Sequence, residues 1–397
     1  MISVLDVRDP REVERLMRAI KVDDYGIRIM APKAVTRLIK VERVSNIAAN
    51  ILKQEMLSLG GDVAVARGAL TGKSKKTSCL IIGSLVQLAR LSDKLLLQPF
   101  GLAQISQSLS QVLRGYAKKD FVIEAAGRRI RTGGRTLIMA VVNVTPDSFS
   151  SDGLASCSVE EAVSRVEGLV ADGADIIDIG GESSRPQARA VPLKEELRRT
   201  IPLIKALRRA VKAPISIDTY KPEVARQALD NGAAIVNDIT ALRDIKMRKV
   251  VARYRAAAVL MHMKGTPRTM QRNPAYEDVV GQIKEFLREA VSRALDAGIK
   301  KERLIVDPGI GFGKTLEHNL EILRRLKEFK SLAQPILVGT SRKAFIGAIT
   351  RTPPQERVFG TLASCILAAE NGAHIVRVHD VKAMRQALDV ADSIKRI

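Results

Sequence analysis

The segment RLIVDPGIGFGKT, residues 303–315, carries a strong fold signal. An apolar run ends in an acid, Asp307, and continues into a glycine-rich turn, which is either a nucleotide-binding P-loop or a tight loop that presents Asp307. The P-loop pattern requires a glycine five positions before Gly313, where this chain has Pro308. Proline removes one of the backbone N–H donors that cradle a phosphate. The segment therefore fits a P-loop poorly, and the rest of the chain must show whether it is instead a tight loop that presents Asp307.

The same order, an apolar run followed by a polar residue and a helical stretch, recurs from residue 136 onward. The runs are 136–143, 174–180, 213–219, 233–238, 257–263, 303–309, 335–341 and 374–380. Because they are apolar on both faces, they are typical of parallel strands buried on both sides. Eight βα units in about 260 residues match a (β/α)8 TIM barrel. We predict this α/β fold over residues 136–397, with a doubly wound open sheet as the alternative.

The helical stretches carry their own end signals. Ser158 and Glu161 form a capping-box pattern before the first one. Several others close on a glycine just past the last turn. These glycines are Gly173, Gly232, Gly298 and Gly372.

The first 135 residues follow a different pattern. We predict a small N-terminal α/β extension of unknown role at 1–118, and a linker with a possible hairpin covering the barrel bottom at 119–135. The helix-like segments are 11–20 and 41–57, and the strand-like ones are 62–66 and 79–83. No catalytic constellation is apparent in this part of the sequence.

Composition restricts the class of protein. Hydrophobic residues make up 46% and charged residues 27%, as in soluble globular proteins, and no uncharged run approaches the length of a membrane span. The first residues carry acids and do not resemble a secretory signal. Three scattered cysteines argue against a disulfide framework or a cysteine metal cluster. We expect a cytoplasmic protein that does not bind membranes.

The net charge of +22 would attract polyanions. However, the basic residues are spread along the chain and aromatic residues are only 3%, so stacking platforms for single strands are not expected. We therefore predict no specific nucleic-acid partner. A generally basic surface favours small anionic substrates.

Polar residues recur where the apolar runs stop, at the end of the barrel strands that carries active sites in this fold. They are Asn143, Asp178, Asp218, Asn237, Asp238, His262, Asp307, Ser341, Arg342, Lys343, Arg377 and His379. Taken singly, Asp178 or Asp238 is equally well explained as a helix cap, and His262 as a core histidine. Taken together, the set predicts one site.

The chemistry of that set is recognisable. Asp and Asn on rigid strand ends suit a flat heterocycle rich in ring N–H and amino groups. Arg377, His379 and Arg185 suit a phosphate or diphosphate. Asn143 is a weak metal ligand alone, and fits Mg²⁺ that keeps its waters and takes further ligands from substrate phosphates.

These motifs resemble the dihydropteroate synthase family. The matching segments are 142–150, 177–186, 217–225, 235–239, 260–271, 307–315, 339–347 and 376–381, in the family's order. The resemblance implies a transferase of folate biosynthesis that joins 6-hydroxymethyl-7,8-dihydropterin diphosphate to 4-aminobenzoate, with Mg²⁺ as cofactor. It leaves residues 1–135 outside the core. We also expect a homodimer.

The resemblance also implies roles for individual residues. Those expected to bind the pterin are Asp218, Asn237, Asp307, Lys343 and Met261. Those expected at the diphosphate are Arg377, His379 and Asn143, with Asn143 as the metal ligand. Those expected around 4-aminobenzoate are Ser184, Arg185, Pro186, Phe149, Phe312 and Ser341. Asp178 and Asp152 are possible supporting residues.

The chain departs from the family's usual pattern in the loops. Ser184 stands where threonine is usual, Gln187 where glycine is usual, and an extra serine in the first loop displaces Asp152. The alternatives are a pterin-binding barrel similar to methyltetrahydrofolate:corrinoid methyltransferases, and a non-catalytic pterin binder. The first would lack the TSRK (340–343) and RVHD (377–380) motifs present here.

Overall fold

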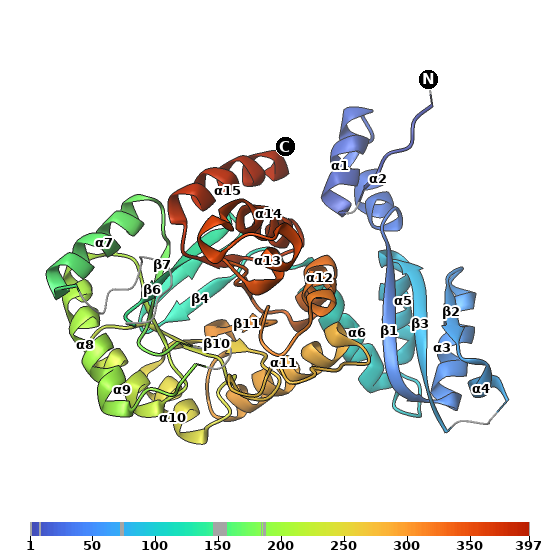
Figure 1. Ribbon diagram of the computed structural model, residues 1–397. Coiled ribbons are helices and arrows are strands. Elements are labelled where there is room, and N and C mark those ends of the chain that lie inside the picture. Colours follow the sequence, from blue (N-terminus) through green and yellow to red (C-terminus); the bar gives the residue numbers. More distant parts are fainter. Residues whose placement is uncertain are drawn as a thin grey trace. The chain divides into compact units, whose positions relative to one another are not determined.

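The computed structural model describes residues 2–7, 9–71, 75–145, 157–183, 185 and 188–396. The chain divides into two compact units, Met1–Arg114 and Gly115–Ile397. Figure 1 labels many of the helices and strands of both. Among the described residues, no helix combines the length and apolar character needed to cross a bilayer.

The larger unit is a closed barrel of eight parallel strands. They are β6 (Leu137–Asn143), β7 (Ile176–Gly180), β8 (Ile215–Asp218), β9 (Ile235–Asp238), β10 (Ala257–Met261), β11 (Leu304–Asp307), β12 (Leu337–Val338) and β13 (Ile375–Val378). Each strand pairs with the next in sequence, and β13 pairs with β6. A parallel bridge between Val306 and Ile336 joins β11 to β12 and completes the ring. The TIM-barrel prediction is confirmed, and the open sheet is excluded.

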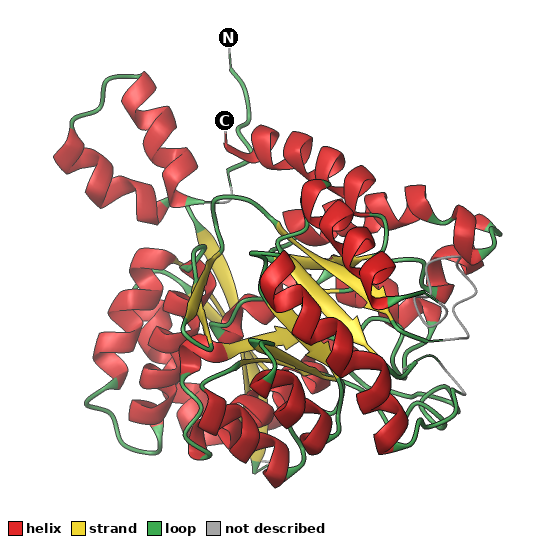
Figure 2. Cartoon of the chain, turned by 90° about the vertical axis from the view of Figure 1, so that its left-hand side faces the viewer, coloured by secondary structure: helices red, strands yellow, loops and turns green. Residues whose placement is uncertain are grey.

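Helices cover the barrel from outside (Figure 2). They are α7 (Val159–Ala171), α8 (Leu193–Ala210), α9 (Pro222–Asp230), α10 (Ile245–Tyr254), α11 (Val279–Asp296), α12 (Leu316–Arg324), α13 (Ala344–Thr350), α14 (Val358–Glu370) and α15 (Val381–Arg396), with 3-10 turns η2 (Lys301–Arg303), η3 (Leu326–Leu332) and η4 (Pro354–Glu356). The predicted Ser158–Glu161 capping box begins α7. The four glycines predicted at helix ends all have positive φ.

Alternation along each strand decides which side chains enter the barrel. On β8, Ile215 and Ile217 belong to the large apolar core shared with the helices. Because successive side chains point to opposite faces, Ser216 and Asp218 face the interior. The strand register places Asp178 of β7 beside Ser216. The interior therefore becomes polar toward the C-terminal ends of the strands.

A hairpin lies at the opposite end of the barrel. It consists of β4 (Val122–Ala125) and β5 (Arg128–Arg131), paired antiparallel. Ile123, Ala125 and Ile130 form one buried cluster with inward-facing residues from the beginnings of the barrel strands, such as Leu137 and Ile375. The hairpin thus extends the apolar interior at the N-terminal end.

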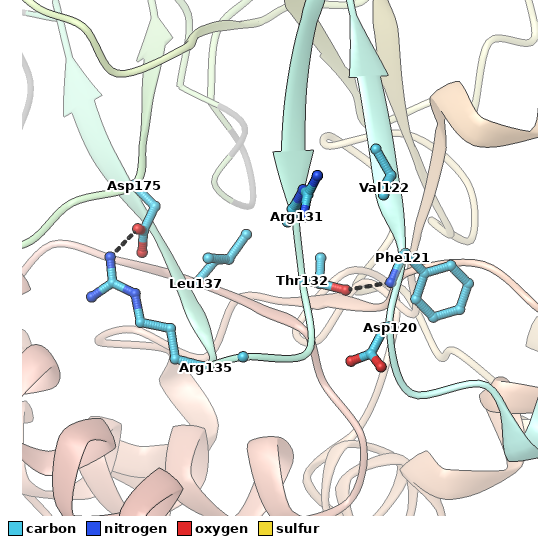
Figure 3. Close-up of a pocket in the computed structure, with 9 residues that line it drawn as sticks. Asp120, Phe121, Val122, Arg131, Thr132, Arg135, Leu137 and Asp175 are labelled. Carbon is cyan, nitrogen blue, oxygen red and sulfur yellow. Dashed lines mark hydrogen bonds and ion pairs between the residues drawn. The ribbon is translucent and has the colours of Figure 1, made fainter.

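A pocket of about 730 Å³ lies beside this hairpin (Figure 3). It is lined by Asp120, Phe121, Val122, Arg131, Thr132, Gly134, Arg135, Leu137 and Asp175. Its polar groups largely satisfy one another, because Arg135 pairs with Asp175 and Phe121 N donates to Thr132 Oγ1 at 3.0 Å. Leu137 is the first residue of β6, so the pocket lies at the N-terminal end of the barrel. It is therefore distant from the polar residues at the C-terminal ends of the strands.

The smaller unit contains an antiparallel sheet in the order β1-β3-β2. Its elements are α1 (Pro10–Ala19), α2 (Asp24–Met30), η1 (Ala31–Lys33), β1 (Thr36–Ser45), α3 (Asn46–Ser58), β2 (Asp62–Val65), α4 (Arg67–Leu70), β3 (Lys76–Ser84), α5 (Leu85–Leu95) and α6 (Leu102–Ala117). The predicted helix over 41–57 is wrong at its start, because residues 41–45 belong to β1. Ser45 ends that strand and caps α3 by accepting a hydrogen bond from Ala48 N.

Candidate active site

Three polar side chains lie side by side at the C-terminal ends of β6, β8 and β9. The register pairs Asn143 with Gly180, Gly180 with Asp218, and Asp218 with Asn237. Gly180 leaves a gap between its neighbours: a Cβ there would lie 3.7 Å from both Asn143 Oδ1 and Asp218 Cβ. The structure therefore brings these residues to one mouth.

The guanidinium of Arg377 connects this group to β7. Its Nε donates to Asp178 Oδ2 at 2.6 Å, and its Nη2 donates to Asp218 Oδ2 at 2.7 Å. Asn237 Nδ2 donates to the same Asp178 oxygen at 3.0 Å. Asp178 is fully buried, and within the described part of the chain its Oδ1 has no hydrogen-bond partner. Asp178 therefore supports the site from below, as a partner of Arg377 and Asn237.

Two of the acids that face the barrel interior have pKa values raised toward neutral pH. Burial raises the pKa of Asp218 to about 7. The charge of Arg377 opposes this shift, and the charge of Asp178 adds to it. Burial also raises the pKa of Asp307 to about 6, against a hydrogen bond from Gly309 N. Perturbed acids at a strand-end mouth are typical of functional sites.

The loop after β11 answers the question raised by its sequence. Gly309 N donates to Asp307 Oδ1 at 2.7 Å, and His262 N donates to Asp307 O at 3.0 Å. Gly309 has φ +69°, and a Cβ there would lie only 2.0 Å from His262 O. Glycine is therefore required for the tight turn that holds Asp307 at the mouth, as the sequence indicated.

Lys343 lies next to this loop. Its Nζ is 4.1 Å from the centroid of the Phe312 ring, and a Cβ on Gly311 would lie 3.2 Å from its Cδ. Burial and the charge of Arg377 lower the pKa of Lys343 to about 8. An apolar cluster adjoins it, formed by Ile239, Met261, Met263, Met270 and Phe312. The mouth therefore has one charged side and one apolar side.

The ends of β12 and β13 are joined by side-chain contacts. Ser341 Oγ lies 2.9 Å from His379 Nδ1 and accepts from His379 N at 3.2 Å. Arg342 Nη2 donates to Asp380 Oδ1 at 2.6 Å. These contacts fix the TSRK and RVHD segments against each other.

Two residues of the strand-end set are structural. Asp238 accepts from Thr240 N at 2.7 Å and Leu242 N at 3.0 Å, so it caps a turn. His262 Nδ1 lies 2.9 Å from the buried Lys314 Nζ, and burial together with that lysine lowers the pKa of His262 to about 2. The interpretation of His262 as a core histidine is confirmed.

Three charged residues near the mouth were not predicted from the sequence. They are Glu182, Glu196 and Lys221, which form one ion-pair cluster. A signal existed, because Glu182 lies two positions after β7 and Lys221 lies three positions after β8. Among the other predicted residues, Arg185 is exposed. Phe149, Asp152, Ser184 and Pro186 lie outside the described residues.

A metal ion would need ligands from a substrate here. Among the described residues, no cluster of three or more His, Cys, Asp or Glu side chains could hold a metal ion. Asn143 offers one neutral oxygen beside an open position at Gly180. This donor set fits Mg²⁺ carried mainly by water and phosphate oxygens.

The family of pterin-binding enzymes matches residues 139–379. A dihydropteroate synthase of Synechocystis is 51% identical over 266 residues, which cover 66% of this chain and 92% of that protein. The chain belongs to the dihydropteroate synthase family. It is therefore a transferase of folate biosynthesis.

Solved structures agree with this assignment. A dihydropteroate synthase of Xanthomonas albilineans, described with 4-aminobenzoic acid, is 44% identical with a TM-score of 0.65 and covers 70% of this chain and 99% of its own. A probable bifunctional folylpolyglutamate synthase/dihydropteroate synthase of Halobacterium salinarum is 42% identical over 99% of this chain and 46% of that protein. The N-terminal unit thus has a counterpart in that relative.

Gly309→Ala should lower both stability and activity. The new Cβ would collide with His262 O, and a left-handed φ costs a non-glycine residue about 1–2 kcal/mol before any collision. We expect a loss of stability well above that figure, measured by urea unfolding.

Gly298→Ala is the matched control. Gly298 has φ +82°, but a Cβ there meets nothing within 4 Å. It should lose only about 1–2 kcal/mol and keep its activity. Equal losses in the two variants would contradict the close-approach explanation.

Proposed function

We propose that the protein condenses 6-hydroxymethyl-7,8-dihydropterin diphosphate with 4-aminobenzoate to form 7,8-dihydropteroate and diphosphate. The observation that carries this proposal is the convergence of Asp218, Asn237, Asp307, Lys343 and Arg377 on one mouth of the barrel. The family assignment supplies the reaction class.

The pterin ring would lie over the carboxylates. A pterin presents ring N–H and amino donors in one plane, and ionised Asp218 and Asp307, at the ends of β8 and β11, are acceptors. Asn237, which is held by Asp178, would offer a fixed amide to the edge of the pterin ring, and Lys343 would offer an ammonium. Unpaired buried polar groups are costly, so this arrangement selects a matching ring. Met261 belongs to the apolar cluster that would contact the ring face.

The diphosphate would lie toward β6 and β13. Asn143 and His379 stand at the ends of these paired strands, and Arg377 points into the barrel between them. Mg²⁺, when bound through Asn143 and phosphate oxygens, would neutralise charge on the leaving group. Arg377 would stabilise the same charge. Preorganised charged groups of this kind supply a large share of enzymatic rate enhancement.

In the reaction, the bond between the pterin methylene carbon and the diphosphate oxygen breaks, and its electron pair leaves with diphosphate. The arylamine nitrogen forms the new bond to that carbon and releases a proton. The chain's contribution is mainly orientation and charge stabilisation. Ser341 and Phe312, with Arg185, are the described candidates for contacting 4-aminobenzoate. The expected homodimer and cytoplasmic location stay predictions.

The proposal is tested by mixing the protein with both substrates and Mg²⁺ and measuring dihydropteroate by chromatography. Asp307→Ala and Lys343→Ala should each lower kcat/KM by on the order of 100-fold, because each removes a group that orients the pterin. Circular dichroism should show a folded barrel in both. The exposed Lys246→Ala serves as control and should stay within twofold of wild type. Near-normal turnover of either site variant would refute the assignment of that residue.

Pterin binding should depend on pH in a bell shape. Below about pH 6–7 Asp307 and Asp218 take up protons and lose the negative charge that strengthens the hydrogen bonds they accept. Above about pH 8 Lys343 loses its proton and with it the positive charge that strengthens the hydrogen bonds it donates. Calorimetry with 6-hydroxymethyl-7,8-dihydropterin, which has no phosphate, measures this directly. Lys343→Arg should move the alkaline limb upward, since arginine stays charged. If the affinity for the pterin stayed the same from pH 5 to 9.5, these ionisations would be contradicted.

Asn143→Ala should weaken the effect of Mg²⁺. Wild-type protein should bind the diphosphate substrate more tightly when Mg²⁺ is present, and removing the amide oxygen should reduce that gain by about 10-fold or more. Calorimetry with and without EDTA measures the gain. Binding of the phosphate-free pterin, measured in parallel, should change little. An unchanged Mg²⁺ gain would remove Asn143 from the metal site.

A further inference from the structure

One lysine outside the strand ends ties together both ends of the segment that follows β7. Lys221, the residue before α9, places its Nζ against the carboxylates of Glu182 and Glu196 and donates to Val191 O at 2.7 Å. Glu182 lies just after β7, and Val191 lies just before α8. A single ammonium therefore holds residues 182 and 191 in place.

The side chains of this ion-pair cluster are largely buried and make further hydrogen bonds. The side chain of Glu196 is 1% exposed, that of Glu182 is 12% exposed, and that of Lys221 is 18% exposed. Thr219 Oγ1 donates to Glu196 Oε1 at 2.6 Å, and Tyr220 OH donates to Glu182 Oε1 at 2.9 Å. Every donor comes from the segment directly after β8. Removing one partner of such a buried ionic group leaves the remaining charges unpaired, which is strongly unfavourable.

The backbone entering the segment is fixed as well. Gly181 packs so closely on α8 that a Cβ would lie 2.7 Å from Thr200 Cγ2. Arg199 Nη1 donates to Gly181 O at 2.9 Å. The chain therefore leaves β7 in a defined direction and meets Lys221 immediately.

Arg185 is the charged residue carried between the two anchors. It is exposed, Arg185 N donates to Ser183 Oγ at 3.4 Å, and Ala188 N donates to Arg185 O at 3.1 Å. Its charge acts on Lys343 at the mouth and lowers the pKa of that residue, after burial and other charges. A shift of either anchor would change where this guanidinium lies relative to the site.

We infer that Lys221 is a positioning residue for the anionic aryl substrate: by holding Glu182 and Val191, it sets the location of Arg185 at the mouth. This inference rests on the proposed function for the identity of that substrate, 4-aminobenzoate. Asn237, Asp307 and Lys343 come from other strand ends, and Asp218, which lies three residues before Lys221, is held in place by Arg377. The expected signature is a change in the arylamine KM alone.

The first test measures the anchoring without any catalysis. In Lys221→Met, which keeps the length of the side chain and removes its charge, backbone amides over residues 181–192 should exchange with deuterium about 10-fold faster than in wild type. Residues 335–347 should exchange unchanged. Lys284→Met is the matched control. Lys284, on α11, places its Nζ 3.0 Å from the carboxylate of Glu328, and loss of this ion pair should leave exchange over residues 181–192 unaffected. Unchanged exchange over 181–192 in Lys221→Met overturns the inference.

The second test measures the consequence for substrate. Lys221→Met should raise the KM for 4-aminobenzoate about 10-fold or more, with kcat and the KM for the pterin diphosphate within about twofold of wild type. Equal changes in both KM values, or none, would overturn the substrate role. A wild-type protein without activity would refute the proposed function and this substrate role together, while the exchange result would still decide the anchoring.

Glu182→Gln covers the case in which Lys221→Met does not fold. This change removes one carboxylate at the start of the segment and keeps the Lys221–Glu196 pair. A selective rise in the KM for 4-aminobenzoate and faster exchange over residues 181–192, both smaller than those expected in Lys221→Met, support the inference. Wild-type behaviour in Glu182→Gln overturns it.

Discussion

A single guanidinium shared by one fully buried and one partly buried carboxylate is the interaction on which this site depends. Arg377 on β13 reaches Asp178 on β7 and Asp218 on β8, so it connects parts of the barrel wall that are not hydrogen-bonded neighbours. Buried charges are tolerated only when they are paired, and breaking such a pair typically costs about 3–5 kcal/mol. The positions of Asp218 and, through Asp178, of Asn237 follow from that arrangement.

The same arrangement carries an electrostatic cost. Two carboxylates share one cation, one oxygen of Asp178 has no partner among the described residues, and desolvation raises the pKa values of Asp218 and Asp307. A ligand with several coplanar donors would relieve these conditions, and a smaller or apolar one would not. The large apolar shell between strands and helices supplies the stability that lets such a site persist.

The fold could be predicted from the sequence because both faces of the barrel strands are mostly apolar and each apolar run stops at or next to a polar residue. The positions of Asp218, Asn237 and Asp307 followed from that rule. It could not separate Asp238 from its neighbour Asn237, since only the alternation of side chains sends Asp238 outward to cap a turn. For the Lys221 cluster, the sequence indicates only that Glu182 and Lys221 follow barrel strands, because spacing beyond a strand carries no information about which contacts are made. The error over residues 41–45 arose because amphipathic helix and edge strand look alike over five residues.

The thinnest part of the barrel wall lies between β11 and β13. The strand between them, β12, has only two residues, and it meets β11 through one bridge. Local opening requires the least free energy where few backbone hydrogen bonds must break. This seam runs directly below the loops that hold Asp307 and Lys343, so slow breathing of the wall would widen the entrance there before anywhere else. The compliant seam thus adjoins β13, the strand that carries the shared guanidinium.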